Sequence, residues 1–128
     1  MVSRKEKQIY EQVLERDRMM TYERMYPQAS SLEAFLASDP WVCVAPMVEK
    51  WPLVDLSVSV RCSGDMERDH VHEHAGGTKA KRAPTTMETL VILCHHHHQN
   101  GWATSHRPEI REYIKVANER HRRLFERD

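Results

Sequence analysis

Apolar side chains recur at helical spacing near the start of the chain, with charged side chains between them. The apolar positions are Ile9, Tyr10, Val13, Leu14, Met20, Tyr22 and Met25. Because positions three and four apart share one face of a helix, this spacing predicts an amphipathic helix over 5–26. Pro27 follows the last of these positions and ends the predicted helix.

A second, shorter helix is predicted over 32–36. Ser30 and Ser31 precede it and can accept the free N–H groups of its first turn. The Asp-Pro pair at 39–40 would end it, because a proline disfavours helical geometry in the residue before it. Residues 1–40 are therefore expected to be a helical scaffold.

The middle of the chain changes to strand periodicity. Apolar and polar residues alternate from Val54 to Cys62, which predicts a strand with one buried face. The Ser-Gly-Asp segment at 63–65 can turn the chain into a second short strand that carries Asp69 and His70. The apolar, β-branched run over 89–94 predicts a further strand.

Helical spacing returns at the end of the chain. The histidines that follow residue 94 are expected to begin a helix, and Pro108 and Glu109 suit the first turn of another. The apolar positions that repeat after them are Ile110, Tyr113, Ile114, Ala117, His121 and Leu124. A C-terminal helix is predicted over 108–126.

Composition limits the class of protein. The chain of 128 residues suits one compact domain over 1–128, and 19 Lys and Arg balance 19 Asp and Glu. The net charge argues neither for nor against a nucleic-acid partner. We see no signal peptide and no apolar run of the roughly 18 residues that a membrane span needs, so a soluble, cytoplasmic protein is expected. The tryptophans at 41, 51 and 102 are expected to be buried or half-buried.

Histidine and cysteine carry the candidate chemistry. Seven of the 9 histidines lie between His70 and His98. Imidazole titrates near neutral pH and binds transition metals, so this density indicates proton transfer or metal coordination. The three cysteines, Cys43, Cys62 and Cys94, are an odd number without a Cys-x-x-Cys pair, which favours reduced thiols or metal ligands over disulfides.

The order of these residues resembles the HNH nucleases. Members of that family end a first strand with Asp-His or His-His, often continue with Gly-Gly, and then carry Asn-Leu-x-x-Leu-Cys-x-x-Cys-His. Here Asp69-His70, Gly76-Gly77 and the segment 89–98 follow the same order over about residues 55–107. The segment 101–107, Gly-Trp-Ala-Thr-Ser-His-Arg, is also similar to tails of small phage-encoded members.

This resemblance implies a fold and an activity. The fold is α+β, with a ββα-metal (His-Me finger) nucleus over 53–107 flanked by N-terminal and C-terminal helices. The activity is that of a metal-dependent DNA endonuclease that leaves 5′-phosphate and 3′-hydroxyl ends. The resemblance further implies DNA as partner, with phage genome processing or packaging beside terminase-like proteins as the setting.

The resemblance also implies roles for single residues. Asp69 and His98 would hold one divalent ion, which can be Mg²⁺, Mn²⁺, Ni²⁺ or Zn²⁺, and His70 would be the general base. Thr89 stands where the family has the asparagine that orients this base. Neighbouring side chains of an ideal strand point to opposite faces, so Asp69 and His70 can meet at one centre only at a twist or a strand end.

Many family members also hold a structural zinc with two Cys-x-x-Cys pairs. Ser59 and His97 stand at two of those four positions here. A set of Cys62, Cys94 and His97 with Cys43 or another histidine could still bind zinc. Buried apolar thiols are the favoured alternative, and His97 could instead serve as a catalytic ligand.

Basic side chains offer contacts to DNA phosphates. Lys79, Lys81 and Arg82 lie in the polar loop that the glycine pair opens, and these three are the candidates. The basic residues of the C-terminal helix alternate with glutamates and are expected to pair within that helix. A non-catalytic, zinc-stabilised module that binds nucleic acid or a partner protein is the competing interpretation.

Overall fold

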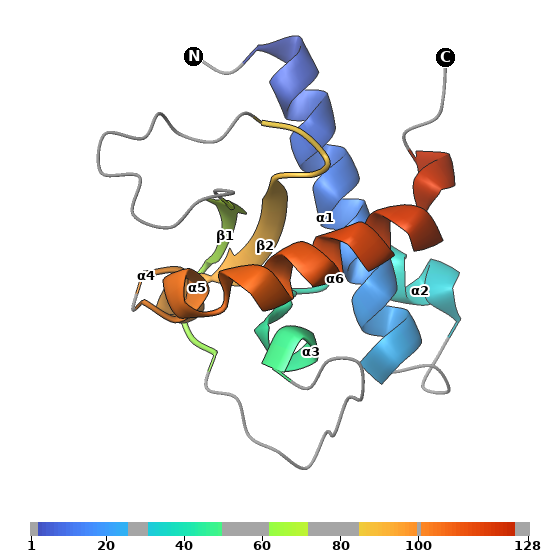
Figure 1. Ribbon diagram of the computed structural model, residues 1–128. Coiled ribbons are helices and arrows are strands. Elements are labelled where there is room, and N and C mark those ends of the chain that lie inside the picture. The colour runs from blue at the N-terminus through green and yellow to red at the C-terminus, as the bar shows by residue number, and fades with distance from the viewer. Residues whose placement is uncertain (1–2, 26–30, 50–61, 72–84, 100, 125–128) are drawn as a thin grey trace.

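The computed structural model describes residues 3–25, 31–49, 62–71, 85–99 and 101–124. In these residues, helices surround a two-stranded antiparallel sheet (Figure 1). The elements in chain order are α1 (Arg4–Met25), α2 (Leu32–Ala37), α3 (Ala45–Glu49), β1 (Met66–His70), β2 (Leu90–Cys94), α4 (His95–Gln99), α5 (Trp102–Ser105), α6 (Arg107–Arg120) and the 3₁₀ turn η1 (Arg122–Leu124). The predicted α+β class is confirmed at this level.

The predicted N-terminal helices are confirmed, and capping explains where they begin. The hydroxyl of Ser3 accepts the N–H of Glu6 at 3.1 Å, and the Glu6 carboxylate accepts the N–H of Ser3 at 3.2 Å. This reciprocal pair starts α1. Ser31 caps α2 by accepting the N–H of Ala34 at 3.1 Å. Among the described helices, none combines the length and apolar character that crossing a membrane requires.

Three differences from the predicted elements have physical reasons. Helices α3 and α5 are too short to produce a helical period in the sequence, and packing rather than propensity supports them. Helix α6 ends at Arg120, because His121 leaves helical geometry and the chain tightens into η1. The strand expected over 54–62 lies outside the described residues, apart from Cys62.

The sheet is the centre of the core. β1 pairs with β2 in the register Met66↔Cys94 to His70↔Leu90. All five residues of β2 are buried, whereas the residues of β1 are partly exposed. The strands predicted around Asp69-His70 and over 89–94 are therefore confirmed. Helix α6 passes over the sheet and over α1 in Figure 1.

A buried ion pair on α1 closes the free edge of β2. Arg16 and Asp17 are both 0% exposed, and their side chains meet at 3.0 Å. The Arg16 guanidinium donates to the carbonyl of Leu90 at 2.7 Å, and the Asp17 carboxylate accepts the N–H of Ile92 at 2.9 Å. The carbonyl of Ile92 accepts the N–H of Val44 at 3.1 Å. Side chains and a loop thus take the place of a third strand.

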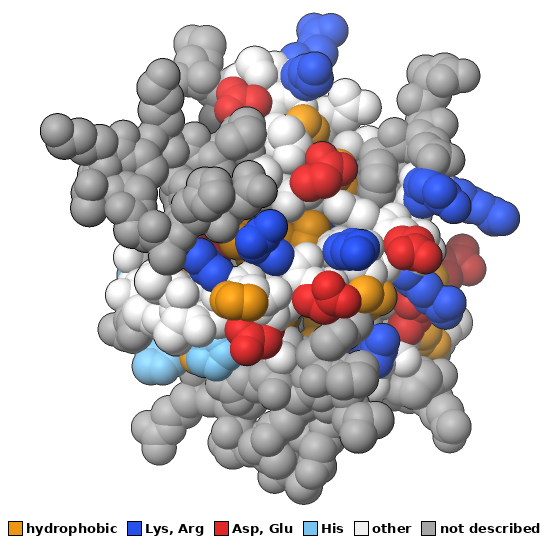
Figure 2. All heavy atoms as spheres, viewed as in Figure 1, with side chains coloured by type: hydrophobic (Ala, Val, Ile, Leu, Met, Phe, Trp, Pro, Cys, Tyr) orange, Lys and Arg blue, Asp and Glu red, His pale blue; other side chains and the backbone are white. Residues whose placement is uncertain are grey.

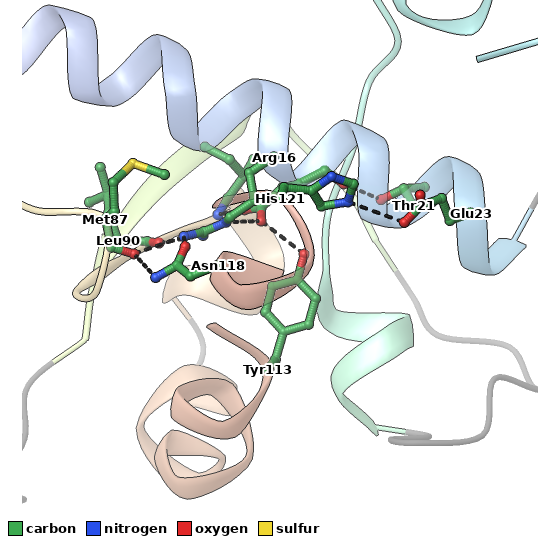
Figure 3. Close-up of polar contacts among 10 residues, drawn as sticks. Arg16, Thr21, Glu23, Met87, Leu90, Tyr113, Asn118 and His121 are labelled. Carbon is green, nitrogen blue, oxygen red and sulfur yellow. Dashed lines mark hydrogen bonds and ion pairs between the residues drawn. The ribbon is translucent and has the colours of Figure 1, made fainter. Parts of the chain in front are cut away.

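The same pair binds α6 to the core (Figure 3). The Tyr113 hydroxyl donates to Asp17 at 2.8 Å, and Asn118 accepts from Arg16 at 2.8 Å. Burial, followed by the charge of Asp17, raises the pKa of Tyr113 well above its usual value. The phenol therefore stays protonated and remains a donor. One charged pair links α1, β2 and α6.

The tryptophan prediction is wrong at one position. Trp41 is 48% exposed, because its indole N–H reaches across to the carbonyl of Gly64 at 3.2 Å instead of entering the core. Trp102 is half-buried, as expected. Trp51 lies outside the described residues.

His121 should make stability depend on pH. Its side chain is 6% exposed, and its Nε2 lies 3.1 Å from the Glu23 carboxylate. Burial lowers its pKa below 6.5 and outweighs Glu23, which raises it. The unfolded chain therefore binds more protons at this position, and stability falls as the pH drops through 6.5 toward the lower pKa of the folded state. The urea midpoint should fall less from pH 7.5 to 5.5 in His121→Gln than in wild type. Equal decreases would contradict this assignment.

Candidate metal centres

The turn before β1 fixes the start of α4. The N–H of His95 donates to the carbonyl of Asp65 at 2.9 Å, and the N–H of His96 donates to that of Ser63 at 3.1 Å. Gly64 lies between these two acceptors with φ +86°, and a Cβ there would lie 2.6 Å from the His95 Cβ. Glycine is the residue that suits both the backbone conformation and the contact. The turn and α4 therefore form one rigid corner.

Replacement of Gly64 by alanine should cost more than replacement of Gly101. Both glycines have positive φ, at +86° and +82°, but no atom lies within 4 Å of a Cβ built at Gly101. Gly101→Ala should lose about 1 kcal/mol from backbone strain alone. Gly64→Ala should lose roughly 1–3 kcal/mol more because His95 must move. Urea denaturation of both variants measures this difference, and equal losses would show that the corner is not tightly packed.

Three cysteines and one histidine lie close together next to this corner. Cys43 precedes α3, Cys62 precedes the turn, Cys94 ends β2 and His97 lies in α4. The His97 Nδ1 is 3.8 Å from the Cys43 Sγ, 3.7 Å from the Cys62 Sγ and 3.1 Å from the Cys94 Sγ. All four atoms lie within 4.8 Å of one another. We call this set the Cys₃His cluster, and it could hold a metal ion.

The cluster has the donor set of a tetrahedral zinc site, with its four ligand atoms within 4.8 Å of one another. Zinc bonds of ~2.3 Å to sulfur and ~2.0 Å to nitrogen place tetrahedral ligand atoms about 3.5–3.8 Å apart. A hydrogen bond to Cys62, together with burial, raises the pKa of the Cys43 thiol. Without a cation this thiol keeps its proton, so metal binding would release protons.

Aromatic packing positions the histidine of the cluster. The Trp102 and His97 rings meet edge to face, with centroids 5.1 Å apart and planes at 77°. The His106 ring stacks on the ring of Trp102, with centroids 4.3 Å apart. The indole is therefore a natural fluorescent reporter of the Cys₃His cluster.

Asp69 and His98 form a second candidate centre, next to the Cys₃His cluster in the chain. The Asp69 Oδ1 lies 3.3 Å from the His98 Nε2, with side-chain exposures of 14% and 25%. A divalent ion about 2.1 Å from each atom would separate them by roughly 3.0–3.4 Å in octahedral or tetrahedral geometry. The structure thus brings together the two residues that the resemblance paired as ligands.

Glu67 belongs to this centre and was missed in the sequence. Its carboxylate lies 2.7 Å from the His98 Nδ1 and 2.6 Å from the His95 Nδ1, and it accepts from Gln99 at 3.1 Å. Hydrogen bonds from His95, then Gln99 and His98, lower the pKa of Glu67 to about 2. The sequence held one signal for this role. Side chains two residues apart in a strand point to the same face, so Glu67 lies on the face of β1 that carries Asp69.

Replacement of Glu67 by glutamine should weaken metal binding at Asp69 and His98. A carboxylate that holds the far nitrogen of a ligating histidine fixes its tautomer and orientation, and its loss typically costs 10–100-fold in affinity. Titration with Mn²⁺ measures this, because Mn²⁺ prefers oxygen and nitrogen ligands to thiolates. The exposed Glu88 provides the matched control, and Glu88→Gln should bind Mn²⁺ like wild type. Unchanged affinity in Glu67→Gln would remove the supporting role.

His70 is the last residue of β1, in the strand where the sequence placed it. Its Nε2 lies 3.0 Å from the hydroxyl of Thr85. The hydroxyl of Thr89, to which the sequence assigned the orienting role, contacts the N–H and hydroxyl of Thr86 at 3.1 and 3.0 Å. Thr85 is thus a threonine that contacts the His70 ring, and no motif in the sequence marked it.

The basic residues give a divided result. Lys79, Lys81 and Arg82 lie outside the described residues. Arg120, expected to pair within its own helix, instead pairs with Glu23 of α1 at 3.2 Å. Figure 2 shows Lys and Arg side chains interspersed with Asp and Glu on the face that α6 crosses. On this face, the described charges along α6 do not form an uninterrupted basic patch.

Comparisons with protein-family models, with curated proteins and with solved structures found no significant match to this chain. The case for a function therefore depends on the chemistry of the two centres.

Proposed function

We propose that this protein is a metal-dependent DNA endonuclease of the HNH type. Asp69 and His98 hold one divalent ion, and His70 removes a proton from the attacking water. The observation that carries the proposal is the 3.3 Å approach of the Asp69 carboxylate to the His98 imidazole, in a β1–β2–α4 order. A ββα-metal nucleus is the fold that we propose for this segment.

The chemistry assigns each residue one task. Hydrolysis of a phosphodiester needs an activated water and stabilisation of the charge on the phosphoryl and leaving oxygens. A bound divalent ion supplies Lewis acidity for the second need. Glu67 holds His98 so that its Nε2 faces Asp69, and Thr85 holds the Nε2 of His70. We assign proton removal to the other nitrogen of that ring, with 5′-phosphate and 3′-hydroxyl products.

Nicking of supercoiled plasmid tests this function. Wild type with Mn²⁺, Mg²⁺ or Ni²⁺ should convert the plasmid to the open circle, and EDTA should prevent it. His70→Ala should lower the rate by roughly 10²–10⁴-fold, because a positioned base contributes about that much. Asp69→Asn should lose nicking that depends on added metal, because it removes a proposed ligand. Glu88→Gln should nick like wild type. Failure of wild type to nick with any of these ions would refute the proposal.

A second candidate function follows from the Cys₃His cluster. We propose that zinc occupies it as a structural ion, so that the fold can serve as a non-catalytic module for nucleic acid or a partner protein. Absence of nicking, together with a large loss of thermal stability on chelation, would favour this module. A role in phage genome packaging beside terminase-like proteins stays a prediction of the sequence resemblance.

A further inference from the structure

The three thiols of the Cys₃His cluster differ in access to solvent. Cys62 is half-buried, whereas Cys43 is 5% exposed and Cys94 is 0% exposed. All three sulfur atoms lie within 4.8 Å of one another. A small oxidant therefore reaches Cys62 first. After a small side-chain movement, the oxidised sulfur of Cys62 can bond to a second thiol of the cluster.

We propose that Cys62 is a peroxide-sensitive modification site that forms a reversible disulfide with Cys43 and thereby expels the bound metal. The inference rests on the metal centre proposed above and is independent of DNA cleavage. In this proposal, the oxidation state of Cys62 determines whether the Cys₃His cluster holds its metal.

The reaction needs one hydrogen peroxide and two thiolates. The sulfur of Cys62 attacks one peroxide oxygen, so that an S–O bond forms, the O–O bond breaks and hydroxide leaves. The sulfur of Cys43 then attacks the Cys62 sulfur, so that the S–S bond forms and the S–O bond breaks. The two sulfurs lose two electrons in total and the peroxide gains them. Two protons convert the two departing hydroxides to water.

The contacts select Cys43 as the second thiol. The Sγ atoms of Cys43 and Cys62 lie 3.8 and 3.7 Å from the His97 Nδ1 and within 4.8 Å of each other. Cys94 is instead bound within its own corner, where its sulfur accepts the N–H of His97 at 3.5 Å and lies 3.1 Å from the Nδ1 of that ring. Cys94 also ends the buried strand β2, whose backbone is held by β1. Cys43 and Cys62 lie outside the strands and can approach each other more easily.

Loss of the metal from the Cys₃His cluster should also affect the candidate centre at Asp69 and His98, through helix α4. The disulfide would leave Cys94 and His97 as the remaining ligands, which is too few for a closed tetrahedral site. His97 of the cluster and His98 of the Asp69 centre are neighbours in the five-residue helix α4. Oxidation should therefore loosen the helix that presents His98 to Asp69.

Zinc release and thiol counting test the inference without any activity assay. The zinc-loaded protein is treated with a small excess of hydrogen peroxide beside a colorimetric zinc chelator. We expect release of one zinc per chain, loss of two of the three thiols, and recovery of both after dithiothreitol. Peptide mapping should find Cys43 joined to Cys62. A disulfide that includes Cys94, or zinc retained with three intact thiols, would overturn the inference.

A ligand-preserving variant provides the control. Cys62→His keeps four ligands but lacks the attacking thiol, and it should retain zinc under the same peroxide. Release from this variant at the wild-type rate would count against Cys62. If the wild type binds no zinc at the outset, the metal-centre proposal fails. Peptide mapping of the metal-free chain then decides the disulfide, which supports the modification site if it joins Cys43 to Cys62 and refutes it otherwise.

Discussion

Removal of the zinc proposed for the Cys₃His cluster is expected to unfold the core. The four ligands come from separate parts of the chain, before α3, before β1, at the end of β2 and in α4. The unfolded chain has no such site, so the binding free energy of the ion acts as folding free energy. Structural zinc in small peptides contributes roughly 10–16 kcal/mol at neutral pH, which is comparable to the whole stability of a typical domain.

Thermal melting with and without a zinc chelator measures this effect. We expect the melting temperature to fall by about 20 °C or more, since each kcal/mol corresponds to a few degrees in a domain of this size. Trp102 fluorescence should change at the same chelator concentration, because its ring contacts His97. In Cys94→Ser the chelator should have little further effect. A wild-type melt that is unchanged after zinc has been removed would contradict a structural role.

Replacement of Arg16 by methionine is expected to be the most damaging change outside the cluster. It would leave the fully buried Asp17 carboxylate without its cation and would remove the donors to the carbonyls of Met87 and Leu90. Loss of one partner of a buried ion pair typically costs 3–5 kcal/mol. Urea denaturation should show a loss of about that size.

Arg18 provides the matched control on the same helix. Its guanidinium pairs with Asp39, whose side chain is 87% exposed. Arg18→Met should therefore cost only about 0–1 kcal/mol. The double variant Arg16→Met with Asp17→Leu removes both charges but still leaves the N–H of Ile92 and the carbonyl of Leu90 without these partners. It should not recover wild-type stability, and full recovery would show that the pair does not serve the edge of β2.

Local patterns in the sequence were enough for the elements that depend on neighbours in the chain. The spacing of apolar residues predicted α1, the serine pair at 30–31 marked the start of α2, and the β-branched run predicted β2. Residue type alone also carried the metal chemistry, because imidazole, thiolate and carboxylate are ligands in any fold. The resemblance suggested a zinc set of Cys62, Cys94 and His97 with Cys43 or another histidine, with buried thiols as the favoured interpretation, and the structure places Cys43 beside the other three. The short helices α3 and α5 were not predictable in this way, because contacts with the rest of the chain support them.

The tertiary structure decided which of those groups meet. Cys43 lies 54 residues from His97 in the sequence, and no local rule brings them to 3.8 Å. Glu67 acquires its role only because α4 folds back over β1 and places two histidines on its carboxylate. Arg16 and Asp17 have the composition of a solvated helix surface, but the open edge of β2 supplies the hydrogen-bond partners that allow their burial. Sequence determined the local geometry and the available chemistry of this protein, whereas long-range packing decided the partners, because a partner's identity depends on residues that the chain brings close only after it has folded.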